Sequence, residues 1–372
     1  MKISGKKIRD EEGDGKKFML EALRLAERGV GKVSPNPLVG AVLVKGGRVV
    51  GRGWHEFYGE KHAEVNAIED AGKDVHGAEL YVTLEPCNHY GKQPPCTKAI
   101  TEAGIRVVHC AIRDPNPVSK SGANALRRKG IKVDFGLCGK EATKQNEAFL
   151  TALRLKRPFI ALKTAMTQDG FITYGDGKAK KISGGNSLDF GQQLRKRLDA
   201  ILVGANTVAK DNPRLTFREN RRFNPIRIIL DSEANISPKA KVFSQLGETI
   251  IVCTKKAREG KMLELAKAGA CVVVAKEKDG MVDIKWLVKW LYLHGIRSVL
   301  VEAGSKIAAS FLSQGLFDRV YILVSPKEIG KGQKGLMAFN LERTLRLRLE
   351  NSEALGKDLL LDIVPVAKGR RH

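Results

Sequence analysis

The chain has 372 residues, 42% of them hydrophobic, which is typical of a globular protein with two domains, each large enough for its own core. Its longest apolar runs are far shorter than the roughly 18 residues of a membrane span, its charged N-terminus does not resemble a secretory signal, and six cysteines are too few for a disulfide scaffold. The net charge of +24 suggests a nucleic-acid partner, but the charges are spread along the chain and aromatic residues make up only 6%.

The first half of the chain alternates helix and strand patterns. Residues 1–16 have little to bury, and we expect a flexible tail there. Helices are predicted at 17–28, 62–71, 95–103, 121–129 and 139–153, and strands at 38–44, 48–53, 79–84, 105–112 and 131–135. This alternation predicts a three-layer α/β/α domain over residues 17–155, which ends before Lys156-Arg157-Pro158 because a proline restrains the residue before it.

The second half, residues 156–372, restarts the alternation and predicts another α/β domain. Its strands are predicted at 158–165, 198–203, 226–231, 249–253, 270–275, 298–302 and 318–325, and its helices at 185–197, 259–268, 283–294 and 305–314. No Gly-x-Gly-x-x-Gly run joins a predicted strand to a predicted helix, as a dinucleotide fingerprint requires. A nucleotide site is indicated only by Glu302-Ala303-Gly304-Ser305, where a strand runs through a glycine into a helix N-terminus suited to a diphosphate. An ordinary strand-to-helix turn is the alternative.

A metal-ligand pattern lies between residues 62 and 96. His62, Cys87 and Cys96 offer Zn²⁺ one imidazole and two thiolates and leave the fourth tetrahedral position open, as in catalytic zinc sites. The predicted helix starts place all three at or near helix N-termini, where the dipole favours thiolate. Glu64 is placed to move protons to and from a zinc-bound water. This pattern is the signature of zinc nucleobase deaminases, and a structural metal knuckle is the alternative.

Four polar residues outside the ligand set are candidates to line the pocket. Asn36 lies between two prolines and its amide suits a pyrimidine edge, although an asparagine in a proline turn is the plainer interpretation. His55, His89 and Lys92 flank the ligands, and a solvated loop is the alternative for the last two. The spacer between the two cysteines is eight residues long, where the common deaminase signature has two.

The long spacer and several further blocks carry a resemblance to one family. The blocks are Tyr81-Val82-Thr83-Leu84-Glu85-Pro86-Cys87-Asn88-His89-Tyr90-Gly91-Lys92-Gln93-Pro94-Pro95-Cys96, Pro35-Asn36-Pro37-Leu38-Val39-Gly40, Asp114-Pro115-Asn116-Pro117, Leu162-Lys163 with Asp169-Gly170, Val203-Gly204-Ala205 with Thr207, Asp211-Asn212-Pro213-Arg214-Leu215-Thr216, and Val301-Glu302-Ala303-Gly304. In this order, and over nearly the whole chain after about residue 17, they resemble the bifunctional riboflavin-biosynthesis deaminase/reductases.

The resemblance implies a cytidine-deaminase-like N-terminal domain and a dihydrofolate-reductase-like C-terminal domain. The first would use Zn²⁺ to deaminate 2,5-diamino-6-ribosylamino-4(3H)-pyrimidinone 5′-phosphate, with Glu64 as the proton carrier. The second would reduce the ribosyl group to ribityl with NADPH. His89 and Lys92 would recognise the ribose phosphate, and Asp114 and Asn116 would lie in the substrate pocket.

In the second domain the resemblance assigns two sets of positions. The reductase substrate would contact Lys163, Asp169, Arg195, Leu215, Arg218 and Glu302. The cofactor would contact Ala165, Lys181, Thr207, Asp211, Ser232, Gly304, Ser305, Lys306, Ile307, Ala308, Ala309 and Ser310. Arginine suits a phosphate because its planar fork binds it bidentately. For the 2′-phosphate of NADPH we expect Thr254, Lys255 and Lys256, although lysines after a strand are more usual on a plain surface.

Several positions depart from the family pattern. Ser34 and Gln93 replace the usual His and Thr, Asn212 replaces an Asp, and the segment Val118-Ser119-Lys120-Ser121-Gly122 replaces a Val-Ala-Gly-x-Gly loop. Lys181 and Ala179 stand where many relatives have Trp and Ser near the cofactor. A deaminase with an inactive reductase-like domain is therefore one alternative.

The basic charge raises a second alternative, an RNA-binding or RNA-editing deaminase. Aromatic residues that could stack bases are few, and a lysine-rich surface or the attraction of phosphorylated small molecules also explains the charge. We therefore predict a cytoplasmic enzyme with a phosphorylated pyrimidine substrate and without a membrane or nucleic-acid partner. The resemblance implies a homo-oligomer, a dimer through the C-terminal domain.

Three further cysteines lie in apolar strand patterns where burial is expected: Cys110, Cys253 and Cys271.

Overall fold

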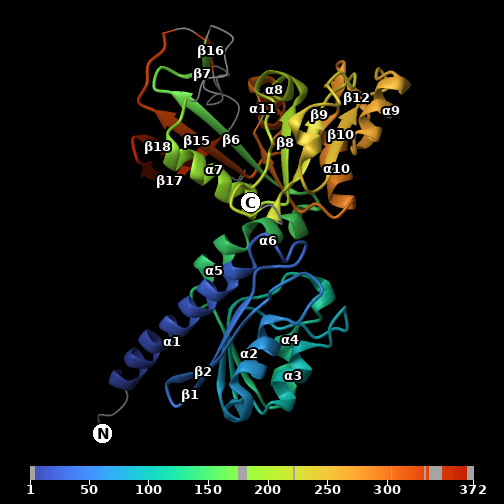
Figure 1. Cartoon of the computed structure of the whole chain (residues 1–372). Helices are drawn as coiled ribbons and strands as arrows, with labels where there is room; N and C mark the ends of the chain where they lie inside the picture. The colour runs from blue at the N-terminus through green and yellow to red at the C-terminus, as the bar shows by residue number, and fades with distance from the viewer. Residues whose placement is uncertain are drawn as a thin grey trace, which may run out of the picture. The chain divides into compact units, whose positions relative to one another are not determined.

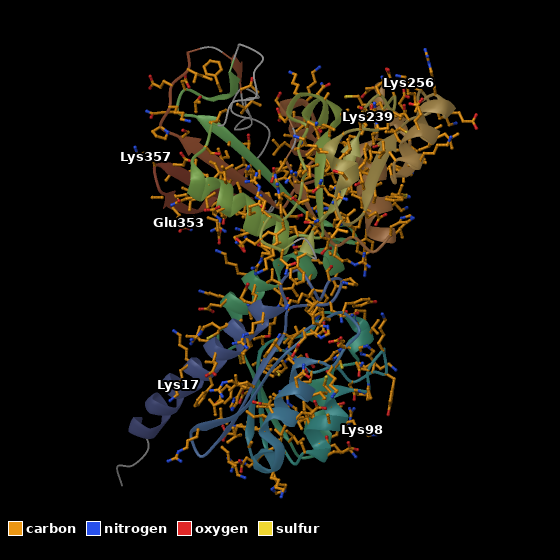
Figure 2. All side chains as sticks on the ribbon, viewed as in Figure 1. Lys17, Lys98, Lys239, Lys256, Glu353 and Lys357 are labelled. Atoms are coloured by element: carbon orange, nitrogen blue, oxygen red, sulfur yellow. The ribbon has the colours of Figure 1, made fainter. Side chains whose placement is uncertain are left out.

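The computed structural model of the chain describes residues 5–174, 182–220, 223–302, 304–330, 332–334 and 346–366 (Figure 1). The chain divides into two compact units, Met1–Leu155 and Lys156–His372, and each has its own sheet and hydrophobic core. Among the described helices, none is both long enough and apolar enough to cross a bilayer. Lysines of both units, such as Lys98 and Lys239, are exposed on the surface (Figure 2).

The first unit is built on a five-stranded mixed sheet with the order β2-β1-β3-β4-β5. Its strands are β1 Gly40–Lys45, β2 Arg48–Trp54, β3 Glu79–Leu84, β4 Val107–Ile112 and β5 Lys132–Phe135. β1 pairs antiparallel with β2 and β3, whereas β3, β4 and β5 run parallel. The parallel strands end at one edge of the sheet, and Cys87 follows β3 there.

Helices cover both faces of this sheet (Figure 1). They are α1 Gly5–Ala26, α2 Ala63–Ala71, α3 Cys96–Glu102, α4 Gly122–Arg128, α5 Gly139–Gln145 and α6 Glu147–Leu155, with 3₁₀ turns at Glu27–Gly29, Gly72–Val75 and Pro117–Ser119. Successive strand residues face opposite sides. Leu80 and Val82 therefore pack with α2, α3 and α4, whereas Tyr81 packs with Phe18 of α1. The predicted three-layer α/β/α arrangement is confirmed.

Helix α2 lies very close to β2. Gly51 and Gly53 of β2 make this possible, because a Cβ at position 53 would lie 2.2 Å from the carbonyl oxygen of Ala63. On the buried side of the helix, alanines recur at every fourth residue: Ala63, Ala67 and Ala71. These small residues set the height of α2 above the sheet, and His62 stands at the N-terminus of that helix.

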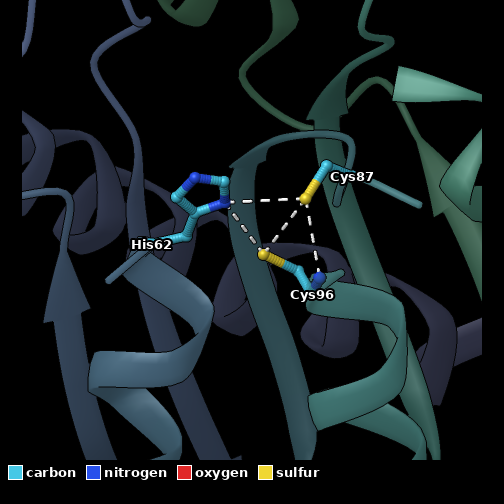
Figure 3. Close-up of side chains that lie close together, drawn as sticks. All are labelled: His62, Cys87 and Cys96. Carbon is cyan, nitrogen blue, oxygen red and sulfur yellow. Dashed lines mark hydrogen bonds between the residues drawn. The ribbon is translucent and has the colours of Figure 1, made fainter. Parts of the chain in front are cut away.

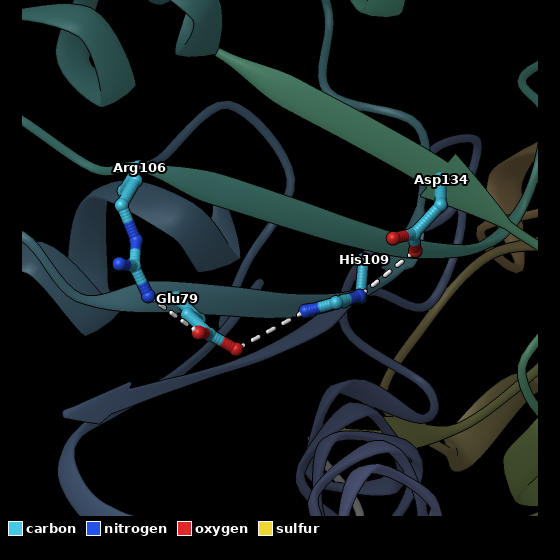
Figure 4. Close-up of polar contacts among 4 residues, drawn as sticks. All are labelled: Glu79, Arg106, His109 and Asp134. Carbon is cyan, nitrogen blue, oxygen red and sulfur yellow. Dashed lines mark hydrogen bonds and ion pairs between the residues drawn. The ribbon is translucent and has the colours of Figure 1, made fainter. Parts of the chain in front are cut away.

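A polar array connects the three parallel strands on the α1 side of the sheet (Figure 4). His109 of β4 lies between two carboxylates, with Nδ1 2.8 Å from Asp134 Oδ1 and Nε2 3.4 Å from Glu79 Oε2. Arg106 donates to the other oxygen of Glu79 at 3.0 Å. His109 is directly opposite Tyr81 and Asp134 in the register, and its ring stacks on Tyr81 with centroids 4.4 Å apart. The array supports the alignment of β3, β4 and β5.

Two helices differ from the sequence prediction. α1 begins at Gly5 rather than at residue 17, so the backbone is helical through most of the segment predicted as a tail, whose flexibility stays a prediction. The predicted helix 139–153 is divided into α5 and α6 at Asn146. The Asn146 side chain accepts from the Leu38 amide at 2.8 Å and donates to the Leu38 carbonyl at 2.9 Å. This tertiary contact bends the chain where the local pattern predicts one helix.

The second unit is built on a nine-stranded sheet with the order β11-β10-β9-β8-β14-β6-β15-β18-β17. The strands from β11 to β15 run parallel, and β18 and β17 close one edge as an antiparallel hairpin. Their bounds are β6 Phe159–Thr167, β8 Ala200–Gly204, β9 Ile226–Leu230, β10 Thr249–Cys253, β11 Cys271–Val274, β14 Ser298–Val301, β15 Arg319–Ser325, β17 Leu347–Leu355 and β18 Asp358–Pro365. Two short pairs lie outside this sheet: β7 Phe171–Tyr174 with β16 Gly332–Lys334, and β12 Glu277–Lys278 with β13 Met281–Val282.

Helices pack on both faces of this sheet as well, so the parallel strands are buried on both sides. The described helices are α7 Gly185–Arg197, α8 Ala205–Asp211, α9 Glu259–Lys267, α10 Ile284–Leu293 and α11 Ser305–Ser313, with a 3₁₀ turn at Lys241–Ser244. α10 and α11 share one core with Leu202 of β8, whereas α8 and α9 share another with Ile201 and Val203. The predicted second α/β domain is confirmed.

Sequence patterns missed the C-terminal hairpin of the second unit. β17 is exposed along almost its whole length and carries mainly polar residues, so it lacks the alternation that marks a half-buried strand. The hairpin nevertheless supports the fold, because the buried carboxylate of Asp358 accepts from the Gly184 amide at 2.7 Å and from the Ser187 hydroxyl at 2.6 Å at the start of α7. Cys110 and Cys253 are buried as expected, but Cys271 is exposed because β11 is an edge strand.

Candidate functional site

Three candidate metal ligands come together at the edge of the first sheet (Figure 3). His62 is the N-cap of α2 and Cys96 is the first residue of α3. Cys87 lies in the segment after β3, and its sulfur is near the N-terminus of α3. His62 Nδ1 is 3.1 Å from Cys96 Sγ and 3.6 Å from Cys87 Sγ, and the two sulfurs are 3.6 Å apart. Among the residues that the structure describes, this is the one such cluster of metal-binding side chains.

The triangle of donor atoms fits Zn²⁺. In a tetrahedral site with Zn–S of about 2.3 Å and Zn–N of about 2.0 Å, two sulfurs lie about 3.8 Å apart and a sulfur and a nitrogen about 3.5 Å apart. The observed separations run from 3.1 to 3.6 Å. Three protein ligands leave a fourth position for water or substrate, which is the arrangement of catalytic rather than structural zinc.

The two cysteines differ in acidity. The hydrogen bond between their sulfurs lowers the pKa of Cys87 to about 4 and raises that of Cys96. The Cys96 backbone N–H, at the start of α3, lies 3.5 Å from Cys87 Sγ and adds to the stabilisation of the thiolate. One thiolate therefore forms readily, and a bound divalent cation would deprotonate the second thiol.

Glu64 lies in the first turn of α2, two residues after His62, and is only 3% exposed. Burial raises the pKa of its carboxyl group. The pKa of this carboxyl group responds to His62, Cys87 and Cys96, so the group borders the ligand triangle without belonging to it. A carboxyl group with a raised pKa is suited to carry protons in both directions.

His55 orients the side chain of Asn36. Its Nδ1 donates to the carbonyl of Lys61 at 3.0 Å, so Nε2 carries the lone pair and accepts from Asn36 Nδ2 at 3.1 Å. Burial lowers the pKa of His55, which keeps the ring neutral. The Asn36 amide therefore presents its oxygen as an acceptor. The His55 ring meets the His62 ring edge-on with centroids 5.4 Å apart, which places this pair beside the ligand triangle.

His89 and Lys92 lie on the loop that joins Cys87 to Cys96. Nδ1 of His89 is buried and, within the described part of the chain, has no hydrogen-bond partner. An unpaired buried polar atom is costly, so this nitrogen is a candidate to bind a ligand. Lys92 is exposed, and its ammonium lies 4.0 Å from the centroid of the Tyr58 ring.

The Asp-Pro-Asn-Pro turn is organised by its own side chains. Asp114 Oδ1 accepts from the Asn116 amide at 2.9 Å, and Asn116 Oδ1 accepts from the Val118 amide at 3.2 Å. Burial raises the pKa of Asp114. These bonds shape the turn, and a contact of either residue with substrate stays a prediction.

Glu85 has a structural role that no sequence pattern predicts. Its buried carboxylate accepts from the Asp114 amide at 3.3 Å and from the Ala123 amide at 3.0 Å. It thereby joins the Asp-Pro-Asn-Pro turn and the start of α4 to the segment that carries Cys87. The only signal in the sequence was an acidic residue directly after an apolar strand.

The described cofactor positions of the second unit lie on the carboxyl-terminal halves of its parallel strands or on the segments that follow these strands. β8 and β14 are neighbours, yet the helices that follow them pack on opposite faces, α8 through Val208 and α11 through Phe311. Such a reversal opens the crevice in which doubly wound sheets bind nucleotides. The end of β8 lies close to α11, because a Cβ on Gly204 would lie 2.8 Å from Ile307 Cδ1.

The individual cofactor positions differ in their surroundings. Thr207 and Asp211 lie on α8, Ser232 follows β9, and exposed Gly304 is the N-cap of the nine-residue α11. The positions from 305 to 310 form the first two turns of that helix, of which Ala308 packs into the core. Ala165 lies on β6. Lys181 and Ala179 lie outside the described residues.

Glu302 is the centre of a charged cluster directly after β14. Arg195 of α7 binds it with two nitrogens, Nη2 at 2.8 Å from Oε2 and Nε at 3.2 Å from Oε1. Burial by itself would raise the pKa of Glu302, but the charges of Lys163 and Arg195 outweigh it and lower the pKa to about 2. Two cations and one carboxylate leave a net positive charge, which suits a phosphorylated ligand.

Three other predicted substrate positions have structural roles. The Asp169 carboxylate accepts from the Thr167 hydroxyl and from two backbone amides, those of Ile329 at 2.9 Å and Gly330 at 2.8 Å. Leu215 is buried and has a φ of 54°. The Arg218 amide donates to Gln192 at 2.9 Å, and its side chain is exposed. Their contact with substrate stays a prediction.

Two family models match the chain in the order of the two units. One, described as the cytidine and deoxycytidylate deaminase zinc-binding region, matches residues 13–112 and includes all three candidate ligands. The other, described as the RibD C-terminal domain, matches residues 158–361. The chain is 42% identical to the riboflavin biosynthesis protein RibD of Aquifex aeolicus over 350 residues, which are 93% of this chain and 97% of that protein. The chain belongs to the RibD family.

The relationship to RibD extends over nearly the whole chain. RibD of Escherichia coli K12 is 35% identical over 366 residues, 93% of this chain and 98% of that protein. A crystal structure from Thermotoga maritima, described as a diaminohydroxyphosphoribosylaminopyrimidine deaminase/5-amino-6-(5-phosphoribosylamino)uracil reductase, superposes with a TM-score of 0.86 at 38% identity, covering 96% of this chain and 100% of that one. This RibD-family chain is therefore a bifunctional deaminase and reductase of riboflavin biosynthesis, with a zinc-binding deaminase domain. The comparisons favour neither alternative.

Glu302→Gln should lower the stability of the reductase unit of this RibD-family protein in a pH-dependent way. The pKa of Glu302 is about 2 in the folded chain and 4.5 ordinarily. A carboxyl group with a lowered pKa stabilises the fold above its ordinary pKa, and this stabilisation is lost as the pH falls through the folded value. The shift corresponds to about 3 kcal/mol. We expect the wild type to exceed the variant in free energy of unfolding at pH 7, and the difference to shrink between pH 4.5 and 2.

Urea denaturation of both proteins, followed at several pH values by a probe in the second unit, measures this difference. A difference that stays constant over this range would mean that the carboxylate is not stabilised by Lys163 and Arg195 as inferred.

Proposed function

We propose that the first unit deaminates a diaminohydroxyphosphoribosylaminopyrimidine and that the second reduces the 5-amino-6-(5-phosphoribosylamino)uracil so formed, the two activities named for the Thermotoga maritima relative. The observation that carries the deaminase proposal is the ligand triangle with an open fourth position and a buried carboxyl group beside it. Zinc held by His62, Cys87 and Cys96 would lower the pKa of a water at the fourth position to about 7 and so supply a nucleophile.

Glu64 carries the protons of the reaction in this proposal. It takes a proton from the attacking water and delivers it to the ring nitrogen, and it then assists the departure of the amino group as ammonia. The net change replaces a C–NH₂ group by a carbonyl at the cost of one water. Asn36, with its oxygen turned away from His55, accepts from a donor on the pyrimidine edge. His89 and Lys92 bind the ribose phosphate, supported by the unpaired His89 Nδ1 and by the positive charge of Lys92.

The second unit uses NADPH in this proposal, bound in the crevice between α8 and α11. The N-terminal amides of α11, entered through Gly304, suit the diphosphate because a helix N-terminus favours anions. NADPH supplies the hydride when bound. Lys163, Arg195 and Glu302 form a net positive cluster next to this crevice, and we assign them to the phosphorylated substrate.

A single assay tests both halves of the proposal. The purified protein with zinc is given the diaminopyrimidine substrate, and ammonia and NADPH oxidation are recorded separately. Ammonia without NADPH oxidation, even when deaminated substrate is supplied, would favour a deaminase with an inactive reductase-like domain. We also propose that the protein is a cytoplasmic homo-oligomer that pairs through the second unit. Light scattering of the whole chain and of its separated units would test the pairing.

The 2′-phosphate of NADPH leads to a prediction for one residue. The three residues expected to bind it differ in the contacts that their side chains already make. The Thr254 hydroxyl donates to the Ser232 carbonyl at 2.9 Å, and Lys256 pairs with Glu277 at 3.1 Å. Lys255 is exposed at the carboxyl end of β10. We expect Lys255→Gln to raise KM for NADPH about tenfold and to leave KM for NADH nearly unchanged, since a charge-assisted bond contributes about 1.5 kcal/mol or more.

Lys256→Gln is the matched control, because it removes the same charge from a residue already paired with Glu277. It should change neither KM. Equal effects of Lys255→Gln on NADPH and NADH, or none on either, would remove this loop from the cofactor site.

A further inference from the structure

Two loops of the first unit begin and end at residues of the zinc site. The first, 56–61, joins His55 to His62, and the second, 88–95, joins Cys87 to Cys96. They are fastened to each other at two points. Gln93 Nε2 donates to the Gly59 carbonyl at 2.9 Å, and the Lys92 ammonium lies 4.0 Å from the centroid of the Tyr58 ring.

The Lys92 side chain is held across the first loop rather than left free in solvent. A Cβ on Gly59 would lie 3.3 Å from Lys92 Cδ and 3.5 Å from Nζ, so the lysine passes directly over this glycine. Gly59 has a φ of 91°, which glycine adopts without strain. Tyr58 is itself anchored, because its amide donates to the Lys32 carbonyl at 3.1 Å. The backbone that carries the ring receiving the ammonium is therefore held in place.

The charge of Lys92 remains available for an anion. Within the described part of the chain no carboxylate forms an ion pair with Lys92, whereas neighbouring Lys61 is paired with Glu69 at 2.6 Å. A ring face attracts an ammonium without neutralising it. The lysine side chain has several rotatable bonds, and ordering them costs free energy when an anion binds. Contact with the Tyr58 ring orders the side chain beforehand and so lowers this cost.

We propose that Tyr58 and Gln93 are positioning residues that hold the Lys92 ammonium at the border of the zinc site to bind the 5′-phosphate of the deaminase substrate. This inference rests on the proposed deaminase function. Tyr58 acts through the ring face and Gln93 through the bond that closes the two loops. Neither residue is a zinc ligand, so both should affect capture of the phosphate and not the rate of the chemical step.

The test compares KM and kcat for ammonia release from the phosphorylated substrate and from its dephosphorylated riboside. Lys92→Met should raise KM for the phosphorylated substrate about ten- to hundredfold, as expected for loss of a charge-assisted contact. Tyr58→Leu should raise it about two- to fivefold and Tyr58→Phe should restore it, because phenylalanine keeps the ring face. Gln93→Ala should raise it as well. In each variant kcat for the phosphorylated substrate should stay unchanged. Both kcat and KM for the riboside should stay unchanged as well.

The chain offers a matched control in the adjacent aromatic residue. Phe57 is exposed to a similar degree, 43% against 46% for Tyr58, and it lies under a different lysine, Lys32 at 5.1 Å. Phe57→Leu should leave KM unchanged. In the Lys92→Met background, Tyr58→Leu should have no further effect on KM, because the group that it positions is gone.

The inference is overturned if Tyr58→Leu lowers kcat for both substrates alike, if Phe57→Leu raises KM as much, or if the two effects add in the double variant. Each result would mean that Tyr58 merely supports the loop. Failure of the proposed function has a different outcome, because the wild type would then release ammonia from neither compound.

Discussion

Glu64→Gln is expected to keep zinc bound and to slow ammonia release by about 10²- to 10⁴-fold, the contribution of positioned proton transfer. The amide has nearly the size of the carboxyl group and fits the same buried position in the first turn of α2, so the ligand triangle should survive. It does not take up the proton of the attacking water. Zinc content from metal analysis and ammonia release from the same preparation measure the two effects.

The same variant also tests the independence of the two sites. Glu64 belongs to the first unit, and the crevice and Glu302 belong to the second. NADPH oxidation with already deaminated substrate should continue at the wild-type rate. Loss of both activities together would contradict the assignment of the two reactions to separate units.

Cys87→Ala should release the metal itself. Two ligands, His62 and Cys96, hold Zn²⁺ far less well than three, and the variant also removes the thiolate of lower pKa. We expect zinc content after dialysis to fall from about one ion per chain to a small fraction of that value, and deamination to disappear with it.

Cys110→Ala is the matched control for this variant, because Cys110 is equally a free, buried cysteine of the same core but is not a member of the triangle. It should retain zinc. Zinc retention by Cys87→Ala, or equal loss from both variants, would mean that the triangle is not the metal site.

The zinc triangle could be predicted from the sequence because its information is local. His62, Cys87 and Cys96 lie within 35 residues of one another, and their chemical types and spacing restrict the metal and leave one position open. The strands and helices that carry them follow apolar patterns that the structure retains. Glu85 is different, because its role depends on amides that lie 29 and 38 residues further along the chain.

Long-range contacts also account for what the sequence patterns missed in the second unit. An exposed carboxylate such as Asp169 gives no sign that it binds amides about 160 residues away, and Lys256 gives no sign that it pairs with Glu277. β17 lacks a pattern because almost nothing on it is buried. Asn146 bends a predicted helix only because Leu38 comes beside it in the fold.

The two glycines of β2 limit how this enzyme can vary. Neither belongs to the ligand triangle, yet a methyl group at position 53 would have to displace the Ala63 carbonyl from 2.2 Å, and one at position 51 that of Ala67 from 2.4 Å. Helix α2 would then move outward and carry His62 with it. A misplacement of about 1 Å can lower a reaction rate about 100-fold. A mutant library aimed at a new deaminase specificity should therefore keep both glycines constant. A relative with a side chain at either position must hold the helix equivalent to α2 farther from the sheet.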